Sequence, residues 1–274
     1  FATSSWFLHF ARLATPDIVF TATIAIIAYG TWVKYTNRHS LALVTGALLA
    51  TSLVYVPGFI WFIVPGIIWQ RKTLLKTMQH ANKPSIALSV IVLILLAPLA
   101  WSVYQNPVIL RELLGAPATI PSASTILNNA LSIPRHLLWA NEQNPVVWLG
   151  RLPLLDVFTI AMLGLGIYSY SFKKKLDRTK MLAGIFLISV VGISLGGRIN
   201  LIIIQPAIYL VATAGVALLL QQWFTVFPRN PLARTIGVSI LSLSVIMVAV
   251  YNTRHYFVAW PNSPETKKVF TLQR

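Results

Sequence analysis

The chain has 274 residues, of which 56% are hydrophobic and only 10% are charged, and its mean hydropathy is +0.71. A soluble domain carries about 25% charged residues, so this composition excludes a soluble globular protein. The net charge of +16 does not indicate nucleic acid binding, because long uncharged runs separate the basic clusters and place them at membrane surfaces. The absence of cysteine excludes disulfides, thiolate metal sites and cysteine nucleophiles.

Long uncharged runs predict an all-α fold, a polytopic bundle of transmembrane helices, since one crossing takes about 17 to 25 helical residues. The candidate spans are 18–33, 40–70, 84–110, 157–172, 181–197, 199–228 and 235–253. The run 40–70 is too long for one crossing and contains Pro57 and Gly58. It predicts a hairpin of two short helices that turns at Val56, Pro57 and Gly58. The chain then has about eight membrane segments.

Charge sets the expected orientation, because short basic loops favour the cytoplasm. With the hairpin in place, most Lys and Arg residues fall in four loops on one side, and both ends of the chain face outward. The outer side then holds nearly all the carboxylates, so we expect any active site to be external. The outward-facing acids are Asp17, Glu112, Glu142, Asp156 and Glu265.

We treat 1–274 as one transmembrane domain, and 105–152 as an extracytoplasmic loop. Because the sequence starts at Phe1 without a methionine or a signal-peptide pattern, we expect the C-terminal portion of a longer protein. Within the loop, Asn106 is placed to cap a helix that starts at Pro107 and stops at Gly115. A second helical pattern follows Ser122. Both helices are expected to be interfacial, lying along the membrane surface.

Motifs of soluble enzymes are absent, and the five histidines are too scattered to form a local metal pair. We therefore assign no metal ligands; a divalent metal stays open as a cofactor but has no support in the sequence, and no other cofactor is indicated.

His9, Arg12 and Asp17 lie together at the outer end of the first span. Ionisable groups at membrane depth are costly and usually functional, so Asp17 is the candidate catalytic carboxylate. Arg12 is its partner or a phosphate ligand, and His9 is a further substrate-binding candidate. The alternative is that Thr15, Pro16 and Asp17 form an ordinary helix start.

Arg198 and Asn200 lie at an outer turn between two spans. The guanidinium of Arg198 could hold the phosphate of a lipid carrier. It could equally extend to lipid headgroups without any further role. The following pair, Gln205 and Pro206, predicts a polar group and a kink inside the next helix. The basic inner loops indicate contacts with anionic membrane lipids.

The order of these features resembles the polytopic membrane glycosyltransferases with the GT-C architecture. Within them it is similar to family 39, the bacterial protein mannosyltransferases and lipid A aminoarabinose transferases. The resemblance rests on the spacing of Arg12 and Asp17 at the start of a span, the short-helix hairpin, the long external loop, the outer turn at Arg198 before a proline-bearing helix, and the tail 256–261.

This resemblance implies transfer of a sugar from a polyprenyl-phosphate donor to a hydroxyl group on the extracytoplasmic face of the bacterial cytoplasmic membrane. It implies that Asp17 with Arg12 forms the second acidic site of these enzymes, and that Arg198 with Asn200 contacts the donor. The first external loop of the family, with its acidic residue, has no counterpart here, so we expect this chain alone to be inactive.

Two other functions stay open. A transporter or flippase for a lipid-linked or anionic solute would use Asp17 and Arg198 as gating or coupling charges. Transporters usually have paired halves and charges at the membrane midplane, and this sequence has neither. A purely structural subunit is the third possibility.

Overall fold

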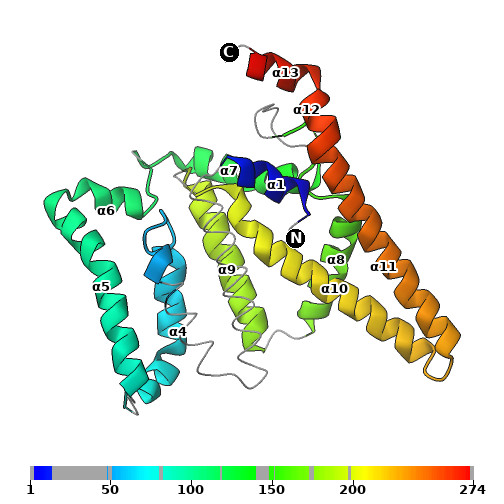
Figure 1. Ribbon diagram of the computed structural model, residues 1–274, viewed down its shortest axis with the longest axis horizontal. Helices are drawn as coiled ribbons and strands as arrows, with labels where there is room; N and C mark the ends of the chain where they lie inside the picture. Colours follow the sequence, from blue (N-terminus) through cyan, green and yellow to red (C-terminus); the bar gives the residue numbers. More distant parts are fainter. Residues whose placement is uncertain are drawn as a thin grey trace. The chain divides into compact units, whose positions relative to one another are not determined.

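In the computed structural model the described residues are 3–13, 48, 51–79, 83–117, 119–139, 148–150, 152–172, 176–196 and 199–271. Within these ranges the secondary structure is helical and contains no strand, which confirms the all-α prediction (Figure 1). The chain divides into two compact units, each described by itself. Unit 1 comprises Phe1–Thr15, Leu131–Phe186 and Ile204–Arg274, and unit 2 comprises Pro16–Ala130 and Leu187–Ile203. The expectation of one transmembrane domain stays a prediction.

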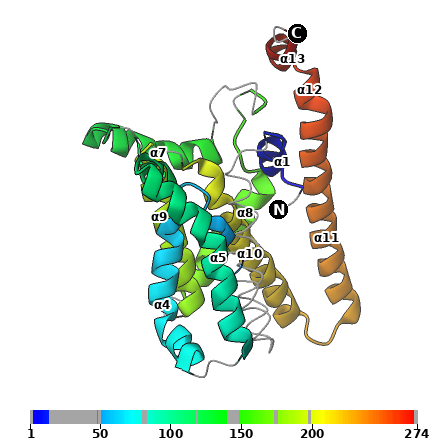
Figure 2. The same ribbon diagram turned by 60° about the vertical axis from the view of Figure 1, so that its left-hand side comes forward.

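Three apolar helices form the body of unit 1. They are α8 (Val157–Ser171), α10 (Gln205–Val226) and α11 (Pro231–Arg254). The carboxylate of Asp156 caps α8 by accepting a hydrogen bond from the Thr159 amide at 2.8 Å. The Asn230 side chain caps α11 by accepting from the Ala233 amide at 3.1 Å. A short turn at 227–230 joins α10 and α11 into a hairpin (Figure 1 and Figure 2).

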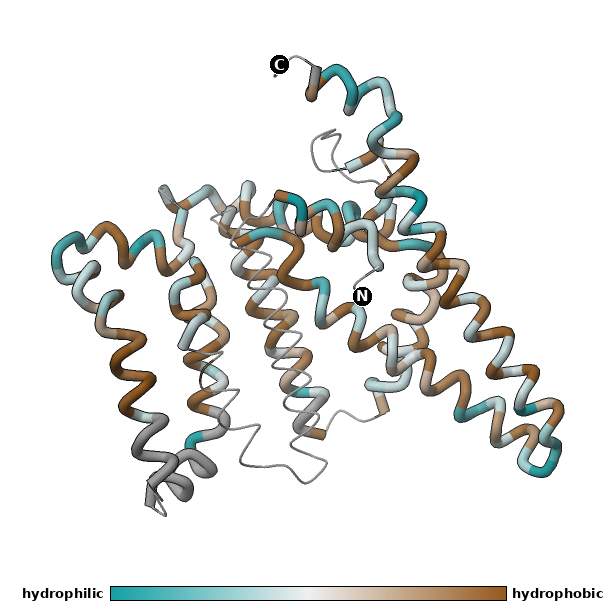
Figure 3. The backbone as a smooth tube through the Cα atoms, viewed as in Figure 1, coloured by the Kyte–Doolittle hydropathy of each residue, from teal (hydrophilic) through white to brown (hydrophobic). Residues whose placement is uncertain are grey.

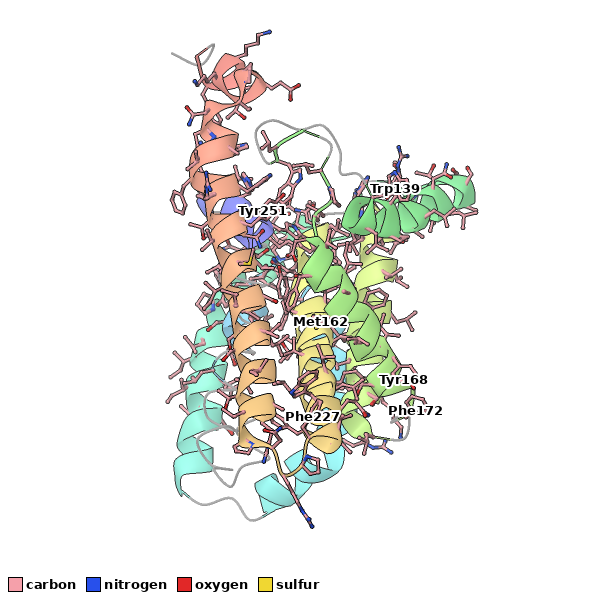
Figure 4. The ribbon with its side chains drawn as sticks, turned by 90° about the vertical axis from the view of Figure 1, so that its right-hand side faces the viewer. Trp139, Met162, Tyr168, Phe172, Phe227 and Tyr251 are labelled. Atoms are coloured by element: carbon pink, nitrogen blue, oxygen red, sulfur yellow. The ribbon has the colours of Figure 1, made fainter. Side chains whose placement is uncertain are left out.

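Helices α8 and α10 pack closely because two glycines remove the side chains from their contact. A Cβ atom on Gly166 would lie 1.9 Å from the backbone oxygen of Val211, and one on Gly215 would lie 2.0 Å from that of Met162. Figure 4 shows Met162 on the stretch of α8 that faces α10. Each backbone therefore occupies the space that a side chain of the other helix would need.

The start of α10 corrects one sequence-based expectation. Pro206 lies in the first turn of α10, after the 3₁₀ helix η1 (Leu201–Ile204), and therefore does not kink the interior of a helix. A first-turn proline is favourable because the amide that it lacks would have had no partner within the helix.

Four shorter elements from the two ends of the chain complete unit 1. The long helix α11 continues into the π-helix η2 (His255–Ala259), α12 (Trp260–Asn262) and α13 (Pro264–Thr271). At the other end of the chain, α1 (Ser5–Arg12) packs against η2. Two further helices, α7 (Ala123–Leu138) and α9 (Asp177–Ser194), have residues in both units.

Unit 2 contains α4 (Ile60–Gln79), α5 (Lys83–Gln105) and α6 (Val108–Leu113). The predicted turn at Pro57 and Gly58 is confirmed: Gly58 has φ +82°, and its amide donates to the Leu113 carbonyl at 2.8 Å. The first helix of the predicted hairpin lies mostly outside the described residues, and α4 runs beyond Gln70. The core of this unit consists of Leu53, Val56, Phe59, Ile199 and Ile203.

Two helical segments among the described residues are long and apolar enough to cross a membrane. They are Leu201–Val226 and Pro231–Asn262, and only 6% of the most apolar stretch of the second is buried. Figure 3 shows hydrophobic residues along most of α11 and hydrophilic ones at its turn with α10. Shorter apolar helices are Ser89–Gln105, Val157–Ser171 and Thr179–Ser194. The candidate span 18–33 lies outside the described residues.

Candidate functional site

Helix α1 places His9 and Arg12 at the C-terminal end of α11. Trp6 and His9 are completely or almost completely buried on one side of α1, whereas Arg12 is exposed. His9 and Arg12 are three positions apart, so their side chains are neighbours along the helix, with His9 inside and Arg12 at the surface. The structure thus brings together His9 and Arg12, two of the residues that the sequence analysis selected.

Two serines attach the start of α1 to polar residues of the apolar helices. The Ser5 hydroxyl donates to Asn252 of α11 at 2.9 Å, and the Gln205 amide of α10 donates to the Ser4 hydroxyl at 3.2 Å. All four side chains are buried. Buried polar groups without partners cost about 1 to 3 kcal/mol each, so these bonds make the docked position of α1 specific.

The π-helix η2 supplies the opposite wall of the site. A π-helix widens one turn of an α-helix, and such turns occur frequently at functional sites. Here the wide turn begins at His255, which is buried, and ends just before the buried Trp260. The local change from α to π geometry therefore places an imidazole and an aromatic side chain next to α1.

The imidazole of His9 is surrounded by rings from three parts of unit 1. Ring centroids lie 4.9 Å away in Tyr256, 5.0 Å in Trp260, 5.1 Å in Trp148 and 5.9 Å in His255. We call these five residues, His9 included, the histidine cluster. Because the rings come from positions far apart in the sequence, the cluster joins the N-terminal helix to the end of the longest apolar helix.

Neither ring nitrogen of His9, nor Nδ1 of His255, has a hydrogen-bond partner among the residues that the structure describes. The pKa of His9 is lowered from 6.5 to about 3, mainly by burial and to a smaller extent by the nearby His255 and Arg12. His9 is therefore a neutral imidazole at physiological pH. In this state one ring nitrogen can accept a hydrogen bond and the other can donate one, without adding charge to the site.

Arg12 forms the exposed edge of the site. Its guanidinium carbon lies 4.5 Å from the centre of the Trp260 ring and 4.7 Å from that of Phe270 in α13. Cation–π contacts of this kind hold a guanidinium in place while its N–H groups stay available to an anion. Arg12 is thus a fixed, accessible cation next to a neutral imidazole.

The other selected residues lie elsewhere or outside the described part of the chain. Asp17 and Arg198 lie outside it, and their predicted roles stay predictions. Asn200 is exposed and belongs to unit 2, whereas His9 and Arg12 belong to unit 1. His9 has only 2% of its surface exposed, and its predicted role in substrate binding stays a prediction.

Sequence reasoning did not find Trp148 and His255 as members of the site. Neither residue lies in a recognisable motif, and only the tail 256–261 gave a signal, through the family resemblance. A metal site also stays without support: no group of three or more His, Cys, Asp or Glu side chains suited to a metal ion occurs in the part of the chain that the structure describes.

No family model matches the chain, and neither a curated protein nor a solved structure matches it.

Proposed function

We propose that this chain is part of a membrane glycosyltransferase that transfers a sugar from a polyprenyl-phosphate donor to a hydroxyl acceptor on the extracytoplasmic face of a bacterial cytoplasmic membrane. The proposal includes a polytopic bundle, in which α10 and α11 cross the membrane and shorter apolar helices add further spans. It is supported by the exposed apolar surface of α11, which requires a nonpolar environment.

The observation that carries the proposal is the position of Arg12 at the end of an apolar helix. A polyprenyl phosphate has its isoprenoid chain in the hydrocarbon core of the membrane and its charged phosphate at the membrane surface. A cation that binds it must therefore lie where an apolar helix ends, and Arg12 lies there, supported by Trp260 and Phe270. A guanidinium also matches the geometry of phosphate oxygens.

The chemistry needs a base, and we assign this role to Asp17, five positions after Arg12. The acceptor oxygen attacks the anomeric carbon of the sugar while the bond from that carbon to the phosphate oxygen breaks. The acceptor proton moves to the carboxylate, and polyprenyl phosphate leaves with the bonding electrons. Arg12 stabilises the negative charge that develops on the phosphate. Neutral His9, buried beneath Arg12, limits the positive charge that the site must hold.

The experiment uses the complete protein in membrane vesicles with a radiolabelled sugar on polyprenyl phosphate. We expect Asp17→Asn to abolish transfer, and Arg12→Gln to lower it by about 10²-fold or more, as for the loss of other transition-state donors. Arg111→Gln is the matched control. Arg111, in α6, is also exposed, but its guanidinium donates to the Pro117 carbonyl.

Full transfer by both Asp17→Asn and Arg12→Gln would reject the proposed site. Loss of a proton- or sodium-dependent solute uptake in these variants, with no sugar transfer by the unmodified protein, would instead favour a transporter.

A further inference from the structure

Helix α7 has more apolar surface than the protein covers. Ile133 and Leu137 are buried, whereas Leu127 and Leu131 keep 60% and 62% of their surface exposed. Leu138 is also exposed. At 3.6 residues per turn, Leu127, Leu131 and Leu138 share one face, about a third of a turn from the buried one. We call these three leucines the outer stripe.

The outer stripe is bordered by a polar face. Ser124, Asn128 and Arg135 follow it around the helix, and all three are exposed. Trp139, directly after the helix, has 82% of its surface exposed. A helix with a basic polar border, an exposed leucine face and a tryptophan at its end has the composition of helices that lie in a membrane interface.

The C-terminal half of α7 is fixed at one end of the apolar helices of unit 1. The amides of Leu154 and Leu155, both buried, donate to the carbonyls of His136 and Leu137 at 3.1 and 3.2 Å. The next residue, Asp156, caps α8. Figure 1 and Figure 4 both show α7 running across the direction of α8, and Figure 4 shows Trp139 at the end of α7. A helix across the end of membrane-crossing helices lies parallel to the membrane surface.

We propose that α7 lies in the interface of an anionic lipid leaflet, with the outer stripe and Trp139 inserted at the boundary between headgroups and acyl chains. Arg135 borders the stripe at the level of the headgroups, and α7 contains no Asp or Glu to offset its positive charge. This charge favours anionic lipids and disfavours a second copy of the chain as the occupant, because two copies would repel each other. The inference does not depend on the glycosyltransferase activity.

The test uses the absence of cysteine from the chain, which allows one labelled cysteine at a time. The full chain with Leu131→Cys carries an environment-sensitive fluorophore and is reconstituted in vesicles of phosphatidylcholine with phosphatidylglycerol. The matched control is Asn128→Cys, three positions away on the polar border. We expect a blue-shifted emission and several-fold slower quenching by iodide at position 131, and a water-like emission at position 128.

A second comparison tests the lipid charge. Arg135→Gln in the Leu131→Cys background should raise iodide quenching in the anionic vesicles and leave it unchanged in vesicles of phosphatidylcholine alone. Circular dichroism checks that each variant keeps its helix content.

Equal iodide quenching at positions 131 and 128 would overturn the proposal. Dipolar coupling between nitroxide labels at position 131 of two molecules would also overturn it, by identifying a second copy as the occupant. Neither result depends on sugar transfer, so a failure of this inference is distinct from a failure of the proposed function.

Discussion

The imidazole of His9 meets the ring of His255 edge to face, with the ring centroids 5.9 Å apart and the planes at 85°. One ring comes from the N-terminal helix and the other from the wide turn that ends the longest apolar helix. Nδ1 of His255 and both nitrogens of His9 lack hydrogen-bond partners among the described residues, so no acceptor there stabilises a protonated His9. Protonation would place a charge next to Arg12 in a buried site.

We therefore predict that acid weakens the fold through His9. In the unfolded chain the imidazole binds a proton near pH 6.5, and in the folded chain its pKa is lowered to about 3. Between these values the unfolded state binds more protons, so stability rises with pH and is lost on acidification. The loss from pH 7.5 to pH 5 is about 2 kcal/mol. Thermal unfolding in detergent micelles at the two pH values measures it.

The variant His9→Phe keeps a ring in the cluster and should remove this part of the acid sensitivity. Trp148→Phe, which changes a ring of the cluster without removing a titratable group, is the control and should unfold with the pH dependence of the unmodified protein. An unchanged pH dependence in His9→Phe would assign the acid sensitivity to other groups.

Several parts of the fold and of the candidate site could be predicted from the sequence because neighbouring residues cause them. The turn at Gly58 needs a positive φ, which glycine adopts readily, and Asn106 binds the Val108 amide at 3.1 Å as an ordinary cap. The proximity of His9 and Arg12 is also local, because they are three residues apart in the sequence, although the sequence did not predict the helix α1 that holds them. These features could be predicted because neighbouring residues determine them.

Other parts depend on contacts between distant residues. Trp148 and His255 contact His9 only when α1 packs against η2. No local sequence pattern predicts the π-helix at His255. Pro206 is compatible with both a kink and a helix start, and the position of α10 decides between them. Helix α4 continues past Gln70 to Gln79 through a stretch that is rich in Lys, Leu and other good helix formers and has no Gly or Pro. A change from apolar to charged residues does not end a helix.

We predict that Asn252→Leu destabilises the docked position of α1. The substitution removes the acceptor of the Ser5 hydroxyl, which is then left buried without that partner, at a cost of about 1 to 3 kcal/mol. Asn262→Leu is a matched control, because the Asn262 side chain is exposed and donates only to the Val258 carbonyl four residues earlier, as Asn252 does to Val248. Thermal unfolding of both variants measures the difference, and equal midpoints would contradict the role of Asn252.

We predict that Gly166→Ala separates α8 from α10. The added Cβ would lie 1.9 Å from the Val211 oxygen, so the helices must move apart, at a cost of about 1 to 3 kcal/mol. Gly164→Ala, two positions earlier, meets nothing within 4 Å. It should leave the unfolding midpoint unchanged or raise it slightly, because alanine is the better helix former. A loss of stability in Gly164→Ala equal to that in Gly166→Ala would show that packing against Val211 is not the cause.

We predict that Arg12→Met releases α13. Arg12 is held against Trp260 and against Phe270 of α13, and two such contacts contribute about 1 to 2 kcal/mol together. Their loss should speed trypsin cleavage at Lys267 and Lys268 by roughly five- to thirty-fold, because cleavage follows the population of the open form. Mass spectrometry of the C-terminal fragments measures the rate. Arg234→Met is the control: Arg234 lies 4.6 Å from the ring of Phe224, in α10, and should not affect α13. Equal cleavage rates in the two variants would mean that Arg12 does not hold this helix.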